Sequence, residues 1–395
     1  MPNQYAQSHF LNEDLSESLN AACESLNDQI HGDIDLIFAF VSGQTAEEFD
    51  RCMPRIKEKT RARVVLGCSC ETAIGGAYEL EHAAAISLWA AKLPDAEITP
   101  MHLTYQRSGG DAAIVGWPST TDGIWDDNSS LLLLGEPFGF PIDVLLERFN
   151  EDRPGVRIAG GMASGAQVPG ESRLLLNDQT YEEGVVAIRI SGTPIRMLVS
   201  QGCRPIGEPM IITASERNII QSLGGKKALN VVYDLFQTLP TSEQQLFQNG
   251  LHVGRVINEY QDKFEYGDFL IRNVIGIDKE TKSISIGDFV RPGQTVQFHI
   301  RDSQSASFEF QQILSRTVAK RPFSAGILFT CNGRGTHLFP DPHHDATCVA
   351  GANNSADGST AAKVPLAGFF AAGEIGPVGN LNFLHGFTAS LVVFD

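Results

Sequence analysis

The sequence predicts a mixed α/β protein of two domains, in which mixed sheets are flanked by helices. The chain has 395 residues, more than the roughly 250–300 at which a single hydrophobic core stops growing. Strand-like and helix-like patterns alternate along it, and a unit of strand, helix and three further strands recurs. We expect an N-terminal helical leader over residues 1–33, a first domain with two repeats over residues 34–235, and a second domain over residues 236–395.

The charge and the cysteine content indicate which classes of partner are disfavoured and in which compartment the protein is expected. The 30 Lys and Arg residues against 47 Asp and Glu residues give a net charge of -17, which repels phosphate backbones and anionic headgroups and so disfavours nucleic acid and membrane partners. The start lacks a basic segment followed by an apolar run. Seven cysteines, an odd number, favour reduced thiols in a chain of this length. Together these features predict a cytoplasmic protein.

The leader and the first repeat can be followed element by element. Residues 12–30 are expected to form an amphipathic helix, and residues 36–43 a buried strand. Thr45 with Glu48 three residues later is typical of a capping box. The helix that follows has an apolar stripe at Phe49, Cys52, Met53 and Ile56. A strand ending in a glycine-rich loop (63–76) and two strand-like runs (83–90 and 98–105) complete the unit.

The same order returns in the next part of the chain. Phe49 and Ile142, Ile56 and Phe149, and Gly67 and Gly160 are each 93 residues apart, which indicates a duplication without a gap. A partial third copy is expected at the C-terminus, because GFFAAGEIGPVG (368–379) resembles GCSCETAIGG (67–76). No helix between its strand and its loop can be recognised.

Between the copies, residues 213–250 have a helical pattern throughout. Residues 269–278, 283–290 and 295–302 are expected to form three short antiparallel strands, because turn signals separate them. A helix follows at roughly 305–319, with its apolar face at Phe310, Ile313, Leu314 and Val318.

Glycine loops just beyond strand ends are the expected place for a ligand, because backbone amides are free there and no Cβ prevents close approach. If the repeats pack together, these loops converge. Arg334 suits a carboxylate, Asn332 offers a donor and an acceptor, and Glu374 suits an ammonium group. This set predicts a pocket for an amino acid. Its members are Asn332, Gly333, Arg334, Gly373, Glu374, Gly376 and His385. The alternative is that Arg334 and Glu374 pair with each other or hold the loops.

Other polar positions give weaker signals. Arg204, between two glycines, is a candidate second cation for the pocket or an ordinary surface turn. Cys68 and Ser69 are candidate site residues, although no nucleophile motif surrounds them, which favours loop packing. The run DPHHD (341–345) could hold a metal, but an exposed turn explains it as well and is favoured. No phosphate-loop or dinucleotide motif is present, and no C-x-x-C-H haem attachment site, which leaves only noncovalent haem open.

Several of these segments together resemble the FIST family. They are GCSCETAIGG, SQGCRPIGEP, RNVIGID, RPGQTVQFHIRD, FTCNGRG, GFFAAGEIGPVG and NFLHGFTASL. Residues from about 34 to 235 resemble the FIST N-terminal domain, and those from about 245 to 380 the FIST C-terminal domain.

The resemblance implies a sensory module that binds small ligands such as amino acids, with some members regarded as haem-linked nitric oxide sensors. Asn332, Arg334, Glu374 and His385 match the family pattern. The first-domain loop departs from it at Glu71 and Ala73, and the turn after Gly379 departs from it at Asn380 and Leu381. FIST domains are often joined to kinase, cyclase or chemoreceptor outputs, so this chain is expected to signal through a partner protein.

We therefore expect a small-molecule sensor without a resident cofactor and without catalysis. One alternative is a hydrolase or transferase that uses Cys68 as nucleophile or Glu374 with His385 for proton transfer. The other is a haem protein.

Overall fold

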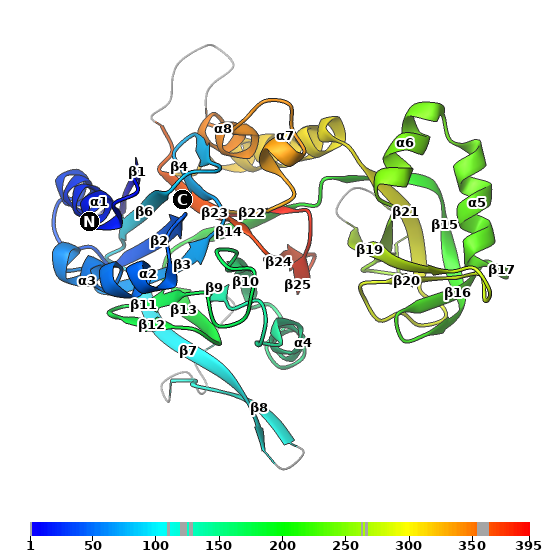
Figure 1. Ribbon diagram of the computed structural model, residues 1–395, viewed down its shortest axis with the longest axis horizontal. Helices are drawn as coiled ribbons and strands as arrows, with labels where there is room; N and C mark the ends of the chain where they lie inside the picture. Colours follow the sequence, from blue (N-terminus) through cyan, green and yellow to red (C-terminus); the bar gives the residue numbers. More distant parts are fainter. Residues whose placement is uncertain are drawn as a thin grey trace. The chain divides into compact units, whose positions relative to one another are not determined.

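The computed structural model describes residues 2–108, 111–118, 125, 129–261, 264, 268–353 and 363–395 (Figure 1). The chain forms two compact units, one of Met1–Val199 with Gln311–Asp395 and one of Ser200–Phe310. This division differs from the expected boundary after residue 235, because the third copy packs with the first two. Every helix in the described ranges is too short or too polar to span a bilayer.

The larger unit contains three copies of one motif. Before them stand β1 (Gln4–Leu11) and α1 (Leu15–Gln29). The first copy consists of β2 (Leu36–Ser42), α2 (Ala46–Cys52), α3 (Arg55–Thr60), β3 (Val64–Cys70), β4 (Ala73–Gly75), β5 (Tyr78–Leu80), β6 (Ala85–Lys92) and β7 (Glu97–Ser108), followed by β8 (Asp111–Val115). The second consists of β9 (Ser130–Gly135), α4 (Ile142–Asp152), β10 (Arg157–Met162), β11 (Leu174–Leu176), β12 (Gln179–Tyr181), β13 (Val185–Ser191) and β14 (Ile195–Ser200).

The third copy is more complete than its sequence suggests. It consists of β22 (Ala325–Cys331), a short 3-10 helix η2 (Gly335–His337), α8 (His344–Ala350), β23 (Leu366–Ala371), β24 (Glu374–Val378), β25 (Leu381–His385) and β26 (Ala389–Phe394). The helix that the pattern does not reveal is α8. The turn expected at DPHHD is therefore wrong in part, because His344 and Asp345 are the first two residues of α8.

Each copy builds its own sheet from two parallel strands and one antiparallel neighbour: β2 and β3 with β6, β9 and β10 with β13, and β22 and β23 with β26. The short hairpin of each copy joins a different sheet, since β4 pairs with β23, β11 with β3, and β24 with β10. Figure 1 shows β4 beside β23, which is far from it in sequence. The three sheets are thus interlocked in a closed cycle.

The outer strands continue this cycle. β7 leaves the first copy to pair with β13, and β14 leaves the second to lie beside β26. β1 pairs with β6 of the first copy, at the place that β7 takes next to β13 and β14 takes next to β26. The N-terminal strand therefore completes the ring. The expected leader contains this strand as well as the predicted helix, which is α1.

One hydrophobic core lies between the inner faces of the three sheets. The ring of Phe40 on β2 lies 5.1 Å from that of Phe369 on β23, and the ring of Trp89 on β6 lies 4.8 Å from that of Phe394 on β26. Helices α1, α2 and α3 cover the outer face of the first sheet, and α4 covers that of the second. The capping box predicted at the start of α2 is confirmed.

A glycine recurs at the same place in each parallel pair. Gly67, Gly160 and Gly368 lie on β3, β10 and β23. A Cβ added there would stand 2.5, 1.9 and 1.8 Å from a carbonyl oxygen of β2, β9 and β22 respectively. The glycines that align in the sequence are therefore needed for close approach of the strands.

The smaller unit is built around one sheet. Its elements are β15 (Cys203–Glu216), β16 (Ile219–Leu223), β17 (Lys226–Lys227), α5 (Ala228–Thr238), α6 (Thr241–Asn249), β18 (His252–Val256), β19 (Phe269–Asp278), β20 (Ser283–Ile286) and β21 (Thr295–Arg301). β15, at one end of the strand order, pairs with β21 and also with β16 near the other end. The sheet therefore closes on itself. The predicted helix at 305–319 is α7 (Ser303–Lys320), which crosses the boundary between the units.

The expectation of helix over residues 213–250 is correct only for its second part, α5 and α6. Residues 213–227 belong to β15, β16 and β17. Arg217 adopts a left-handed φ of 53° between β15 and β16, which turns the chain sharply and prevents a continuous helix. The apolar side chains of Ile220 and Leu223 are buried in the sheet's own core.

Candidate functional site

The loops that follow β3, β10 and β23 converge, as their place at the strand ends predicts. The amide of Phe370 donates to the carbonyl of Thr72 at 2.9 Å, and that of Ala372 donates to Met162 at 3.0 Å. Ser164 accepts from the amide of Glu71 at 2.9 Å and donates to the carbonyl of Phe370. All three copies therefore contribute to one junction.

Arg334 lies just beyond β22 and is completely buried. Its guanidinium binds the Asp345 carboxylate in bidentate fashion, with Nε–Oδ2 at 2.6 Å and Nη2–Oδ1 at 2.8 Å. Thr330 donates to the same carboxylate at 2.8 Å, and Phe339 lies under the guanidinium at 5.2 Å. Arg334 thus holds a carboxylate, as its chemistry predicts, but that carboxylate comes from its own chain.

Asp345 also connects α8 with the first copy. Burial opposes its ionisation, but Arg334 and His344 hold the pKa of Asp345 well below its usual range. Its amide and that of Ala346 donate to Glu79 Oε1 on β5, at 2.9 and 3.1 Å. Burial, together with the charge of Asp345, raises the pKa of Glu79 to about 7. Sequence reasoning missed Glu79, because nothing in the pattern shows that its hairpin joins the third sheet.

Glu374 opens β24 and is completely buried. Its Oε2 accepts hydrogen bonds from the amide and hydroxyl of Thr388, at 3.0 and 2.8 Å. Within the described ranges, Oε1 receives no hydrogen bond of normal geometry. Burial raises the pKa of Glu374 to about 8, although Thr388, Arg334 and the Cys331 thiol oppose the rise. This carboxyl group is therefore protonated at neutral pH when nothing else balances its charge.

The remaining predicted residues of this half lie around Glu374. Cys331, Asn332 and Gly333 are half-buried, and the amide of Asn332 donates to the carbonyl of Ala371 at 3.2 Å. His385 faces Glu374 across β24 and β25 and lies 3.0 Å from the Gly376 carbonyl oxygen through Nε2.

Two glycines of the predicted set are required by packing. A Cβ at Gly376 would stand 2.4 Å from Val199, and one at Gly373 would stand 2.9 Å from Leu384. The close neighbours explain why these two positions carry no side chain.

Three predicted residues lie elsewhere. The Cys68 side chain belongs to the central core, where burial raises its pKa far above the usual range. Ser69 accepts from the amide of Arg173 at 3.0 Å. Arg204 belongs to the smaller unit, where it pairs with Asp302 and Glu243, at 3.0 Å in each case.

A cavity of about 550 Å³ lies outside this set, beside α4. Aromatic and basic side chains line it, among them Tyr105, Trp117, Phe149, Arg148 and Arg153. The sequence analysis did not single it out. The clustering of these aromatic residues depends on β7 crossing to the second sheet, which the sequence does not show.

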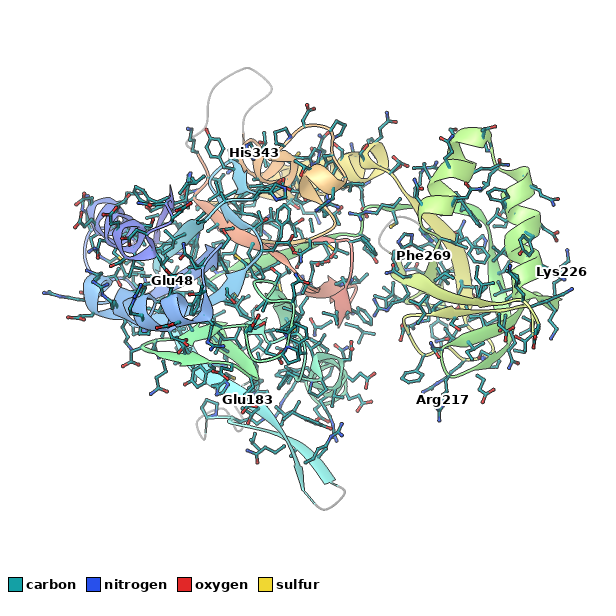
Figure 2. All side chains as sticks on the ribbon, in the orientation of Figure 1. Glu48, Glu183, Arg217, Lys226, Phe269 and His343 are labelled. Atoms are coloured by element: carbon teal, nitrogen blue, oxygen red, sulfur yellow. The ribbon has the colours of Figure 1, made fainter. Side chains whose placement is uncertain are left out.

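The DPHHD run does not form a metal site in the described part of the chain, where no group of three or more His, Cys, Asp or Glu side chains is placed to hold an ion. Asp345 is engaged by Arg334, and His344 lies 2.9 Å from Asp345 through Nδ1. Figure 2 labels the neighbouring His343 next to α8.

Comparison with known proteins identifies the two halves of the chain. The FIST N domain matches residues 35–226, and the FIST C domain matches residues 228–377. An uncharacterized protein of Mycobacterium tuberculosis is 38% identical over 341 residues, which cover 86% of this chain and 85% of that protein. An uncharacterized protein of Mycobacterium bovis is 37% identical over 332 residues, which cover 84% of this chain and 82% of the relative. FIST domains are generally regarded as sensory domains in signal transduction. With both family domains matched over nearly the whole sequence, this chain belongs to the FIST family.

Proposed function

We propose that this chain is a sensory domain that binds a small ligand with a primary ammonium group, such as an amino acid, at the carboxyl ends of β22 and β23. The observation that carries the proposal is the buried Glu374 carboxyl group, whose Oε1 receives no hydrogen bond of normal geometry within the described residues and has the Cys331 thiol beside it. An ammonium group would supply a charge-assisted hydrogen bond there. A partner protein would then distinguish the ligand-bound state from the free state.

The balance of charge around Glu374 supports a cationic ligand. The cluster holds three acids (Glu79, Asp345 and Glu374) and two bases (Arg334 and His344). Burying an unbalanced carboxylate is costly, so a proton neutralises it in the absence of another cation. An ammonium ligand would replace that proton. Binding at neutral pH is therefore expected to release a proton from Glu374.

The route that we propose for the ligand to Glu374 runs over the end of β22. Cys331, Asn332 and Gly333 are half-buried, and the Cys331 thiol lies beside the Glu374 carboxyl group. Asn332 Oδ1 is a second acceptor without a hydrogen bond in the described ranges. Movement of this three-residue loop would expose both acceptors to a ligand.

The role expected for Arg334 remains a prediction. Its guanidinium is engaged by Asp345 on two nitrogens, so a ligand carboxylate at Arg334 would have to displace Asp345. Amines that lack a carboxylate test the role of Glu374 separately from that of Arg334. Their ammonium group would bind Glu374, and they carry no group that Arg334 could bind.

The experiment is a thermal-shift screen of the full chain with the twenty amino acids and their decarboxylated amines. A ligand at a hundredfold excess over its dissociation constant should stabilise the protein by about 2.7 kcal/mol. Glu374→Gln keeps the shape of the side chain but cannot become an anion, and should abolish the shift. Glu183→Gln is the matched control, since Glu183 is exposed and lies away from α8 in Figure 2.

A ligand that stabilises the Glu374→Gln variant as strongly as the unsubstituted chain would contradict the proposed site. A Trp117→Ala variant then decides whether that ligand occupies the cavity beside α4, which Trp117 lines. Proton release in weakly buffered solution on binding provides an independent check.

A further inference from the structure

His344 stands between a carboxylate and a thiol on α8. Its Nδ1 lies 2.9 Å from Asp345 Oδ1, and its Nε2 lies 4.0 Å from Cys348 Sγ. Phe339 stacks on the imidazole with ring centroids 3.6 Å apart and planes 9° from parallel. The ring is therefore fixed in an orientation that aims one nitrogen at each partner. Cys348 is thus placed as a nucleophile, His344 as its base and Asp345 as the carboxylate that orients the base, which is the arrangement of enzymes with activated thiols.

The thiol of Cys348 is partly exposed, and a positively charged imidazolium lies next to it. Cys348 and Cys331 are half-buried, whereas the other five cysteines are buried. Gln311 Nε2 lies 3.9 Å from Cys348 Sγ on the side of α7. Burial opposes protonation of His344, but its bonds to Asp345 and Cys348 raise its pKa to about 9. A neighbouring imidazolium stabilises a thiolate over a thiol.

Cys331 offers a comparison within the same molecule. Like Cys348 it is half-buried, but its neighbour is the Glu374 carboxyl group rather than an imidazolium. The amide of Gly333 donates to Cys331 Sγ at 3.5 Å, but a carboxylate next to a thiol disfavours the thiolate. The surroundings therefore distinguish the two accessible cysteines by charge.

We propose that Cys348, His344 and Asp345 form a thiol site that hydrogen peroxide oxidises. The Sγ thiolate attacks one peroxide oxygen, so that an S–O bond forms and the O–O bond breaks. The departing hydroxide takes the proton from His344 Nε2 and leaves as water. Sulfur loses two electrons and becomes a sulfenic acid, while the peroxide is reduced. Such a small oxidant requires no large pocket beside α8.

Oxidation of Cys348 would also change the charges around Arg334. His344 becomes neutral in the step, and Asp345, which it shares with Arg334, then keeps one cationic partner instead of two. The site therefore adds an oxidant input to the third copy. The reaction at Cys348 does not require an ammonium ligand at Glu374.

The test uses the full, reduced chain treated with hydrogen peroxide in the presence of dimedone, which traps sulfenic acid. Peptide mass spectrometry should show Cys348 labelled at least tenfold faster than Cys331. Alkylation by iodoacetamide, in which the thiolate displaces iodide, should likewise be faster at Cys348 than at Cys331.

His344→Asn keeps a donor for Asp345 but has no group at the position of Nε2. It should slow labelling of Cys348 at least tenfold and leave Cys331 unchanged. Equal labelling of the two cysteines in the unsubstituted chain would overturn the proposal, and so would an unchanged Cys348 rate in a folded His344→Asn variant. If that variant does not fold, the comparison of the two cysteines decides alone.

Discussion

Replacing Glu374 by glutamine should stabilise the larger unit at neutral pH. The pKa of this carboxyl group rises from 4.5 to about 8 on folding, mainly because it is buried. A raised pKa in the folded state contributes to the free energy of unfolding. This contribution is complete below pH 4.5 and is lost as the pH rises towards 8. At pH 7 the lost contribution corresponds to about 3 kcal/mol. Glutamine resembles the protonated form, and its side-chain oxygen can accept the two bonds from Thr388.

Tryptophan fluorescence during urea unfolding measures this effect selectively. All three tryptophans, Trp89, Trp117 and Trp125, belong to the larger unit. The Glu374→Gln variant should be more stable than the unsubstituted chain by about 3 kcal/mol at pH 7, with a smaller difference at pH 5. Glu183→Gln should change nothing at either pH. An equal difference at pH 5 and pH 8 would refute the reasoning, because it would mean that Glu374 does not take up its proton on folding.

Three further predictions concern stability. Gly368→Ala should cost more than about 3 kcal/mol or prevent folding, since its Cβ would meet a backbone oxygen at 1.8 Å, whereas Gly386→Ala meets nothing within 4 Å and should be nearly neutral in urea unfolding. His252 and His299 both have their pKa lowered to about 4, chiefly by burial. The smaller unit should therefore lose about 3 kcal/mol for each histidine as the pH falls from 6.5 to 4. Hydrogen exchange of residues 200–310 at pH 7 and pH 4.5 measures this loss, and equal protection at the two would contradict it. Thr45→Ala should cost about 1 kcal/mol, because the capping box at α2 is lost, and an unchanged urea midpoint would argue against it.

The sequence allows the fold to be predicted where the signal is local and periodic. The apolar stripes of α1 and α7 and the hydroxyl cap at Thr45 depend on residues a few positions apart. The aligned glycines Gly67, Gly160 and Gly368 also reveal the repeats, because the same close approach of strands is required in each copy. The sheet that each hairpin joins is not predictable in this way, since strands of three to five residues are too short for a recognisable period.

For the candidate site, residue types indicate chemistry but do not name partners. Arg334 is predicted to bind the carboxylate of a ligand; in the structure it pairs with Asp345, which only the fold selects from among the 47 acidic residues. Cys68, singled out because it lies beside a glycine loop, points into the core. The sequence pattern did not indicate a role for Cys348, although α8 places it next to His344.

The amino-acid sequence by itself determined the repeated motif, the mixed α/β class, the family and the chemical types gathered at the strand ends. Only the tertiary structure decided which copy supplies which hairpin, and with it the contacts between Glu79 and α8 and between the three loops. The physical reason is the range of the interactions. Helix periods, caps and close glycines act between near neighbours or recur in every copy, whereas the contact of Glu79 with α8 joins segments 266 residues apart. The burial of Glu374 and Arg334 likewise arises only when the packed segments exclude water together.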